Sequence, residues 1–148
     1  MKIYLAADHA GFIFKEKIKA FLEKEGIQTE DCGAFSYNKE DDYPDFIVVA
    51  ARKVSQDPGS YGIVVGKSGA GECIVANKVK GIRAFLGVTE ENVLLAREHN
   101  DANVLSLGSE IVSEEQANKL VKLFLQTPFS KEERHIRRIE KIRKIEES

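Results

Sequence analysis

Short apolar segments alternate with amphipathic segments along the chain, and this alternation restricts the possible folds more than any other feature of the sequence. Five segments have the length and composition of buried strands, namely residues 2–7, 27–32, 61–65, 82–86 and 104–107. Segments of helical period separate them, and a highly charged helix follows Pro128. Because β-α alternation builds parallel sheets covered by helices on both faces, the sequence predicts a three-layer α/β fold. It has a five-stranded parallel sheet and an extended C-terminal helix at about residues 130–147.

Three of the predicted helices begin at recognisable capping residues. Thr89 is the expected N-cap of a helix that runs through His99. The pairs Ser113 with Gln116 and Ser130 with Glu133 have the spacing of capping boxes, so each serine is expected to begin a helix.

The length and charge of the chain indicate one domain that binds a small partner. Its 148 residues suffice for a single domain with a full core, spanning residues 1–148. Lys and Arg total 22 against 24 for Asp and Glu, and the net charge of −2 gives no general attraction to nucleic acid or anionic membranes. No apolar run approaches membrane-spanning length and the N-terminal residues do not form a signal peptide, so a cytoplasmic location is expected by elimination.

The two cysteines, Cys32 and Cys73, have neither a metal-binding spacing nor the pattern of a disulfide framework. We expect both to be free thiols, which suits a reducing compartment. Cys73 adjoins the apolar residues 74–76, and this favours packing over chemistry for its side chain.

A glycine-rich loop follows the third predicted strand and ends in a carboxyl group. It contains the hydroxyl of Ser68, the carboxyl group of Glu72 and three glycines, Gly66, Gly69 and Gly71. Glycines free the backbone to aim several N–H groups at one point, as an oxyanion or a phosphate requires. The loop can therefore bind an anion and place Glu72 beside it.

Two other interpretations of this loop are a nucleotide-binding P-loop and a purely structural turn. A nucleotide-binding P-loop needs four residues between its first glycine and Gly-Lys-Ser, but only three separate Gly62 from Gly66, so this interpretation is rejected. A glycine-rich turn considered alone is more often purely structural. The other polar residues of the chain have to distinguish the structural interpretation from the functional one.

Several polar residues follow the predicted strands at their carboxyl ends, where parallel α/β sheets bind ligands. Asp8 and His9 follow the first strand, Tyr43 lies in the long loop after the second, and the glycine loop follows the third. These groups should share one edge of the sheet. His99 and Asn100 end the helix before the fifth strand, so they belong to the opposite edge unless they complete the site of a neighbouring subunit.

These residues stand in motifs that resemble the type B ribose-5-phosphate isomerase family over almost the whole chain. The motifs are Asp8-His-Ala-Gly11, Asp31-Cys-Gly33, Asp42-Tyr-Pro44, Gly66-Lys-Ser-Gly-Ala-Gly-Glu72, Ala76-Asn-Lys78, Gly81-Ile-Arg83, Ala96-Arg-Glu-His-Asn100 and Arg134-His-Ile-Arg-Arg138. The resemblance implies a Rossmann-like sheet and a homodimer or dimer of dimers with shared active sites. It implies no metal and no cofactor.

The resemblance also implies an activity, the isomerisation of ribose 5-phosphate to ribulose 5-phosphate through an enediolate. Glu72 resembles the base that moves a proton between C2 and C1, and a partly closed apolar turn should raise its pKa. One branch of the family uses a cysteine base at the position of Gly66, so here Glu72 takes the role. Ser68 and the loop amides resemble the oxyanion cradle, which places Gly66, Lys67, Gly69, Ala70 and Gly71 among the substrate-binding residues.

The histidines divide between function and structure. His9 resembles a residue at the phosphate end of the substrate, and the alternative is a histidine bonded to a loop carbonyl. His99 resembles the acid/base that opens the furanose ring, and the alternative is a cationic group at a helix C-terminus. His135 is expected at the surface or at an interface.

Other residues are assigned to substrate binding by the same resemblance. Asp8 belongs with them, and Tyr43, Asn77 and Asn100 resemble groups that hold hydroxyls or loops, although Tyr43 is alternatively a core aromatic.

Arg134 and Arg138 share a helix face and resemble phosphate ligands reached from a partner subunit. An apolar stripe on the same helix would dock it there, formed by Ile136, Ile139, Ile142 and Ile145. The alternative is a solvated helix with Glu133–Arg137 and Glu140–Lys144 as ordinary pairs.

One departure from the family concerns Glu110. Many relatives have an arginine at this position, where it helps to hold the phosphate, and a carboxylate would repel that group. Either Glu110 turns outward, or the site takes another sugar phosphate with four or six carbons. A non-catalytic sugar-phosphate-binding protein on the same fold is the remaining alternative.

Overall fold

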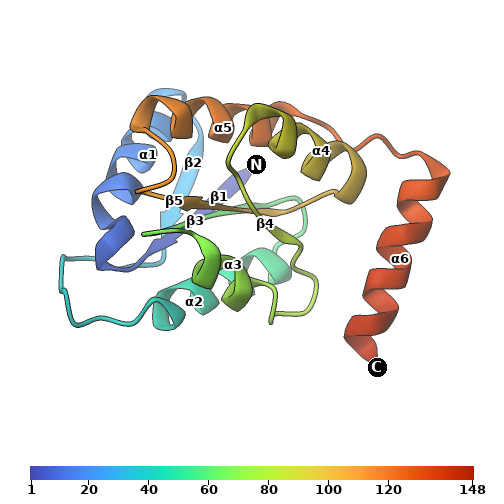
Figure 1. The fold of residues 1–148 in the computed structure, drawn as a ribbon, viewed down its shortest axis with the longest axis horizontal. Coiled ribbons are helices and arrows are strands. Elements are labelled where there is room, and N and C mark those ends of the chain that lie inside the picture. Colours follow the sequence, from blue (N-terminus) through green and yellow to red (C-terminus); the bar gives the residue numbers. More distant parts are fainter.

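The computed structural model describes all residues, 1–148, and contains one parallel sheet between two layers of helices (Figure 1). The strand order is β2-β1-β3-β5-β4, and every neighbouring pair is parallel. The strands are β1 (Lys2–Ala7), β2 (Gln28–Asp31), β3 (Tyr61–Gly66), β4 (Ala84–Leu86) and β5 (Val104–Gly108). The predicted five-stranded parallel sheet is confirmed.

Helices connect the strands and cover both faces of the sheet. They are η1 (His9–Gly11), α1 (Phe12–Lys24), α2 (Tyr43–Gln56), α3 (Ala70–Ala76), α4 (Glu90–Asn100), α5 (Glu114–Gln126) and α6 (Glu133–Glu147). The three-layer arrangement with an extended C-terminal helix is therefore confirmed as well.

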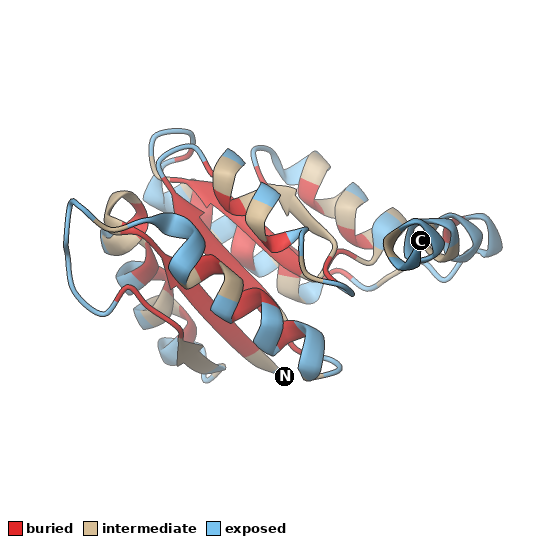
Figure 2. Cartoon of the chain, turned by 90° about the horizontal axis from the view of Figure 1, so that it is seen from below, coloured by how far each residue is buried: buried red, intermediate tan, exposed pale blue.

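The alternation of side chains along the central strands builds two hydrophobic cores. In β1, Ile3 and Leu5 face one core, which α1, α4 and α5 close, whereas Tyr4 and Ala6 face the other, which α2 and α3 close. Figure 2 shows the central strands buried throughout and the helices buried only on their inner sides. This rigid centre fixes where the loops at the two edges of the sheet begin and end.

The helix α6 stands away from the rest of the chain (Figure 1). It contacts chiefly α4, and the exposed residues of its apolar stripe are Ile136, Ile142 and Ile145. Near its C-terminal end, the Glu146 carboxylate accepts a hydrogen bond of 2.9 Å from the backbone N–H of Gly81. Much of the apolar face of α6 therefore has no partner within the chain.

The predicted caps are partly right. Thr89 caps α4 in a reciprocal capping box with Asn92, and Ser113 accepts the backbone N–H of Gln116 at 3.1 Å. Ser130 does not cap α6, which begins later, after Glu132. The Ser130 hydroxyl lies 2.9 Å from Nδ1 of His135 instead, because the chain turns back toward α4 before the helix begins.

Both edge strands are shorter than predicted, because each pairs with only one neighbour. Tyr43 was expected in a loop, yet it is the first residue of α2, where the following Pro44 suits the first helical turn. The two cysteines are free thiols, as expected. None of the helices combines the length and the apolar character needed to cross a membrane.

Candidate active site

The glycine loop between β3 and α3 has a fixed shape. Gly69 precedes α3 with a positive φ of 81°, which favours glycine, and its carbonyl accepts a hydrogen bond of 2.7 Å from the buried hydroxyl of Ser106. A Cβ on Gly69 would lie 2.6 Å from the Leu86 side chain. The loop is therefore held against β5, and this contact fixes the position and direction in which α3 begins.

Glu72 lies in the first turn of α3 with only 4% of its surface exposed. Its carboxyl group lies against Gly66, where an added Cβ would be 2.1 Å from the Glu72 Cδ. Burial raises the pKa of Glu72, the charge of Asp8 adds to the increase, and the N–H groups of Glu72 and Gly69 oppose it. The structure thus places a carboxyl group of raised proton affinity at the end of β3.

Tyr43 and Asp8 lie around this carboxyl group. A Cβ on Gly71 would lie 2.6 Å from Cζ of Tyr43, so the phenol packs directly over the glycine loop. Asp8 is buried and accepts the N–H of Gly11 at 3.2 Å, and Gly11 itself packs against the end of β3. Tyr43 belongs to the site by position, and it is too exposed to be a core aromatic.

His9 is bonded to a loop carboxylate and not to a loop carbonyl. Its Nδ1 lies 2.6 Å from Oδ1 of Asp41, and its backbone N–H donates to the same oxygen at 3.0 Å. The bond to Asp41 raises the pKa of His9, while burial opposes the increase less strongly. The carboxyl edge of the sheet therefore brings together Asp8, His9, Tyr43 and Glu72, as the strand pattern predicts.

The polar side chains of the glycine loop are exposed. Ser68 Oγ accepts the N–H of Ala70 at 3.2 Å, and the Lys67 ammonium lies 3.9 Å from the Glu110 carboxylate. The Glu110 side chain is 66% exposed, so it turns outward beside the loop. The first of the two alternatives for Glu110 therefore fits its position.

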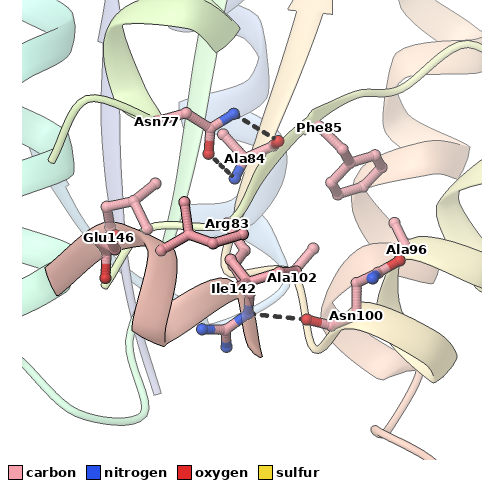
Figure 3. Close-up of a pocket in the computed structure, with 11 residues that line it drawn as sticks. Asn77, Arg83, Ala84, Phe85, Ala96, Asn100, Ala102, Ile142 and Glu146 are labelled. Carbon is pink, nitrogen blue, oxygen red and sulfur yellow. Dashed lines mark hydrogen bonds between the residues drawn. The ribbon is translucent and has the colours of Figure 1, made fainter. Parts of the chain in front are cut away.

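Asn77, Asn100 and His99 lie at the opposite, amino edge of the sheet. There a cavity of about 470 Å³ opens between α3, α4 and α6 (Figure 3). The Asn77 amide bonds the backbone N–H and C=O of Ala84 at 2.8 and 2.9 Å, and Arg83 donates to the Asn100 carbonyl at 2.8 Å. Asn77 thus holds the loop before β4, and this cavity is separate from the carboxyl group of Glu72.

His99 stacks on His135, with ring centroids 4.2 Å apart. His135 is expected at the surface or at an interface, and of these two the surface is excluded, since only 2% of the residue is exposed. Burial lowers the pKa of His135, and the adjacent His99 adds to the decrease. His135 thus packs beneath His99 where α6 begins.

Arg134 and Arg138 are exposed on α6, which stands away from α3, the helix that carries Glu72 (Figure 1). Arg134 lies 3.5 Å from the Glu132 carboxylate, and Arg138 forms no ion pair. The pairs Glu133–Arg137 and Glu140–Lys144, which belong to the alternative of a solvated helix, are absent, and Glu140 pairs instead with Arg143 three residues on. Both candidate phosphate ligands are therefore accessible.

Asp8, His9 and Asp41 are the residues that could hold a metal ion, since their potential ligand atoms lie within 4.8 Å of one another. These atoms already have partners, however. Asp41 accepts from His9, and Asp8 accepts from Gly11. We interpret the cluster as a hydrogen-bonded support for His9.

Known proteins resemble the chain over nearly its full length. The family described as Ribose/Galactose Isomerase matches residues 3–142. The chain belongs to the ribose/galactose isomerase family. Ribose-5-phosphate isomerase B of Mycolicibacterium paratuberculosis is 49% identical over 140 residues, which make up 95% of this chain and 88% of that relative. The corresponding protein of Mycobacterium tuberculosis is 46% identical, with 95% and 86% covered.

Solved structures of the ribose/galactose isomerase family share the fold. Ribose-5-phosphate isomerase B from Clostridium thermocellum superposes with a TM-score of 0.95 at 39% identity, covering 99% of this chain and 98% of that one. The protein from Mycoplasma genitalium, solved with bound ribulose 5-phosphate, has the same TM-score and identity, with 99% and 97% covered. The predicted family and its Rossmann-like sheet are confirmed.

The sequence does not reveal the buried contacts of three polar residues of this isomerase. Lys15 is fully buried beneath the loop after β2, Arg97 is buried at the end of α4, and Asp41 holds His9. The first two stand in helices of ordinary amphipathic pattern, and Asp41 stands in a run of acidic residues that resembles a solvated loop. Only the contacts made across the fold distinguish them.

Proposed function

We propose that the chain is a type B ribose-5-phosphate isomerase, which interconverts ribose 5-phosphate and ribulose 5-phosphate through a cis-enediolate. The observation that carries this proposal is the carboxyl group of Glu72, buried at the start of α3 beneath the glycine loop. The names of the relatives and the ribulose 5-phosphate bound in the Mycoplasma genitalium structure support the choice of substrate.

Glu72 is the base in this proposal. It removes the proton from C2 of the open-chain aldose and returns it to C1, and its raised pKa improves the match between base and carbon acid. Ser68 and the backbone amides of Gly66, Lys67, Gly69, Ala70 and Gly71 stabilise the oxyanion that forms between the two proton transfers. The reaction needs only acid and base groups of the chain, in line with the expectation of no cofactor.

The other residues proposed to bind the substrate lie in two separate parts of the chain. Asp8, His9 and Tyr43 bind the substrate beside Glu72, with His9 at the phosphate. We further propose that His99, Asn100, Arg134 and Arg138 complete the site of a partner subunit in a homodimer or tetramer. The first two lie at the opposite edge of the sheet from Glu72, and the arginines lie on α6, which stands away from the rest of the chain. The exposed isoleucines of α6 support this assembly.

Two further proposals concern the domain organisation and the location of the protein. Residues 1–148 act as a single isomerase domain whose C-terminal helix packs on the partner. The protein works in the cytoplasm, and its two free thiols fit a reducing compartment.

The decisive experiment replaces Glu72 by Gln, which keeps the size of the side chain and removes its basicity. Turnover of ribose 5-phosphate should fall by roughly 10²–10⁴, the usual range for a positioned base. Exchange of the C2 hydrogen with deuterated water, followed by NMR, should fall in parallel. The control is Glu115→Gln, an exposed carboxylate on α5, which should keep full activity. Near-normal turnover in Glu72→Gln would remove Glu72 from the mechanism.

An isomerase for another sugar phosphate is the second candidate, because Glu110 stands where many relatives have an arginine, although its outward orientation does not require a different substrate. Comparing kcat/KM for tetrose, pentose and hexose phosphates decides between the two substrates. A protein that binds sugar phosphates without catalysing their isomerisation would show binding but no exchange at C2 with any of them.

A further inference from the structure

Asp41 makes two hydrogen bonds to one residue, His9. The carboxylate oxygen Oδ1 lies 2.6 Å from the imidazole Nδ1 and accepts the backbone N–H of His9 at 3.0 Å. The Asp41 side chain is 9% exposed, whereas that of His9 is 31% exposed. The imidazole therefore has one side fixed to a nearly buried carboxylate and another side accessible to a ligand.

The contact to Asp41 determines which ring nitrogen can meet a ligand. A carboxylate accepts hydrogen bonds, so Nδ1 of His9 carries a proton and Nε2 is the nitrogen left for other partners. In the neutral ring Nε2 would be an acceptor, and it could not donate to a phosphate oxygen. In the cationic ring Nε2 is a donor, and its hydrogen bond to an anion is charge-assisted.

The surroundings of His9 favour the cationic ring and a fixed orientation. The acidic groups that face it are Asp8 from the end of β1 and Glu40 and Asp41 from the loop before α2, and all three raise the pKa of His9. The ring of Tyr37, from the same loop, stands edge-on to the imidazole at 6.1 Å. The loop thus holds the imidazole of His9 through the carboxylate of Asp41 and through the ring of Tyr37.

We propose that Asp41 is a positioning residue for His9, which it holds with Nδ1 toward the protein and a protonated Nε2 toward the phosphate of the substrate. This inference rests on the proposed function, in which His9 receives that phosphate. It gives the acidic loop a role that its sequence does not suggest. Asp41 itself touches neither the sugar nor the reacting carbons.

The first test is Asp41→Asn, which keeps the shape of the side chain and removes its charge. The KM for ribose 5-phosphate at pH 7.5 should rise about tenfold while kcat changes little, because a charge-assisted contact to the phosphate weakens. The rise of KM with pH should also begin at lower pH than in the wild type. Asp41→Glu should restore part of the lost affinity. Glu40→Gln, which removes the same charge one residue away without a bond to His9, should alter KM much less.

The second test follows the imidazole of His9 directly by ¹H–¹⁵N NMR in the intact protein, with His9→Asn used to assign its signals. In the wild type, Nδ1 should stay protonated and the ring should titrate above the ordinary histidine range. In Asp41→Asn the titration should move to lower pH. An unchanged titration, or an unchanged pH dependence of KM, would overturn the proposal. Since the NMR titration needs no turnover, it separates this failure from an inactive wild type, which would overturn the proposed function instead.

Discussion

Glu72 illustrates how burial can adjust a single side chain to its task. Its carboxyl group is nearly inaccessible, and burial is the largest cause of its raised pKa. The charged form is thereby destabilised in the folded protein, so this group contributes less to stability above its unfolded pKa than below it. Such a loss of stability is typical of groups retained for chemistry.

The raised pKa of Glu72 predicts the acid limb of the pH profile. The base acts only when ionised, so kcat/KM should fall on acidification, and the midpoint should lie above the ordinary glutamate value of 4.5. Steady-state kinetics on ribose 5-phosphate between pH 4 and 8 measures the midpoint, with circular dichroism at each pH to confirm that the protein stays folded. A midpoint at or below 4.5 would contradict the proposed environment of Glu72.

Among the helices, α1 is tied to the sheet by an ion pair that helical periodicity does not reveal. The Lys15 ammonium is fully buried and lies 2.8 and 3.0 Å from the two carboxylate oxygens of Asp31, at the end of β2. It also donates to the carbonyl of Ala34, in the loop that leads to Asp41. A single side chain therefore joins α1, β2 and the loop that supports His9.

Lys15→Met should destabilise the protein strongly, because it removes the buried ammonium that bonds both oxygens of Asp31 and leaves that carboxylate with only Lys19 at 3.5 Å and the N–H of Gly33. The expected decrease in the free energy of unfolding is about 3–5 kcal/mol, and Lys15→Met with Asp31→Asn should recover part of it. Urea denaturation measures both. The control is Lys17→Met on the same helix, whose pair with Glu114 is exposed and should contribute at most about 1 kcal/mol. Equal losses in the two single variants would show that the burial of Lys15 has no energetic consequence.

These elements also show what the sequence can and cannot predict. The central strands are identifiable because both faces are buried, so their apolar runs are continuous. The burial of Lys15 cannot be predicted from the sequence, because amphipathic patterns assign charged residues to the outside and its partner stands 16 residues further along. The capping-box spacing predicts Ser130 as a cap, but its backbone N–H is tied to the Glu98 carbonyl of α4 and the helix begins only after Glu132. Local sequence patterns predict local structure, but they do not predict contacts between residues that are distant in the sequence.

In the complete fold, the residues assigned to the site occupy both edges of one sheet. Glu72 lies at the carboxyl edge, and His99 and Asn100 lie at the amino edge, separated by strands that span roughly 17–20 Å. Under the proposed assignment, one chain carries parts of a site that it cannot assemble alone. The proposed symmetric dimer would solve this problem, since each subunit would supply what the other lacks.

Mixing two inactive variants tests this arrangement. Glu72→Gln and the double variant Arg134→Ala with Arg138→Ala should each be nearly inactive as pure proteins. After joint unfolding and refolding, mixed dimers should contain one intact site, and the activity should return to about a quarter of the wild-type value. Refolding each variant alone is the control. No recovery, despite mixed dimers detected by native mass spectrometry, would show that each subunit builds its own site.

The close contact between Gly66 and the Glu72 carboxyl group has a consequence for any substitution at position 66. The branch with a cysteine base places a side chain at the position of Gly66, and here even a Cβ would collide with Glu72. A side chain at position 66 would therefore displace the Glu72 carboxyl group from its place against β3, so a larger residue there should impair any reaction that depends on that position.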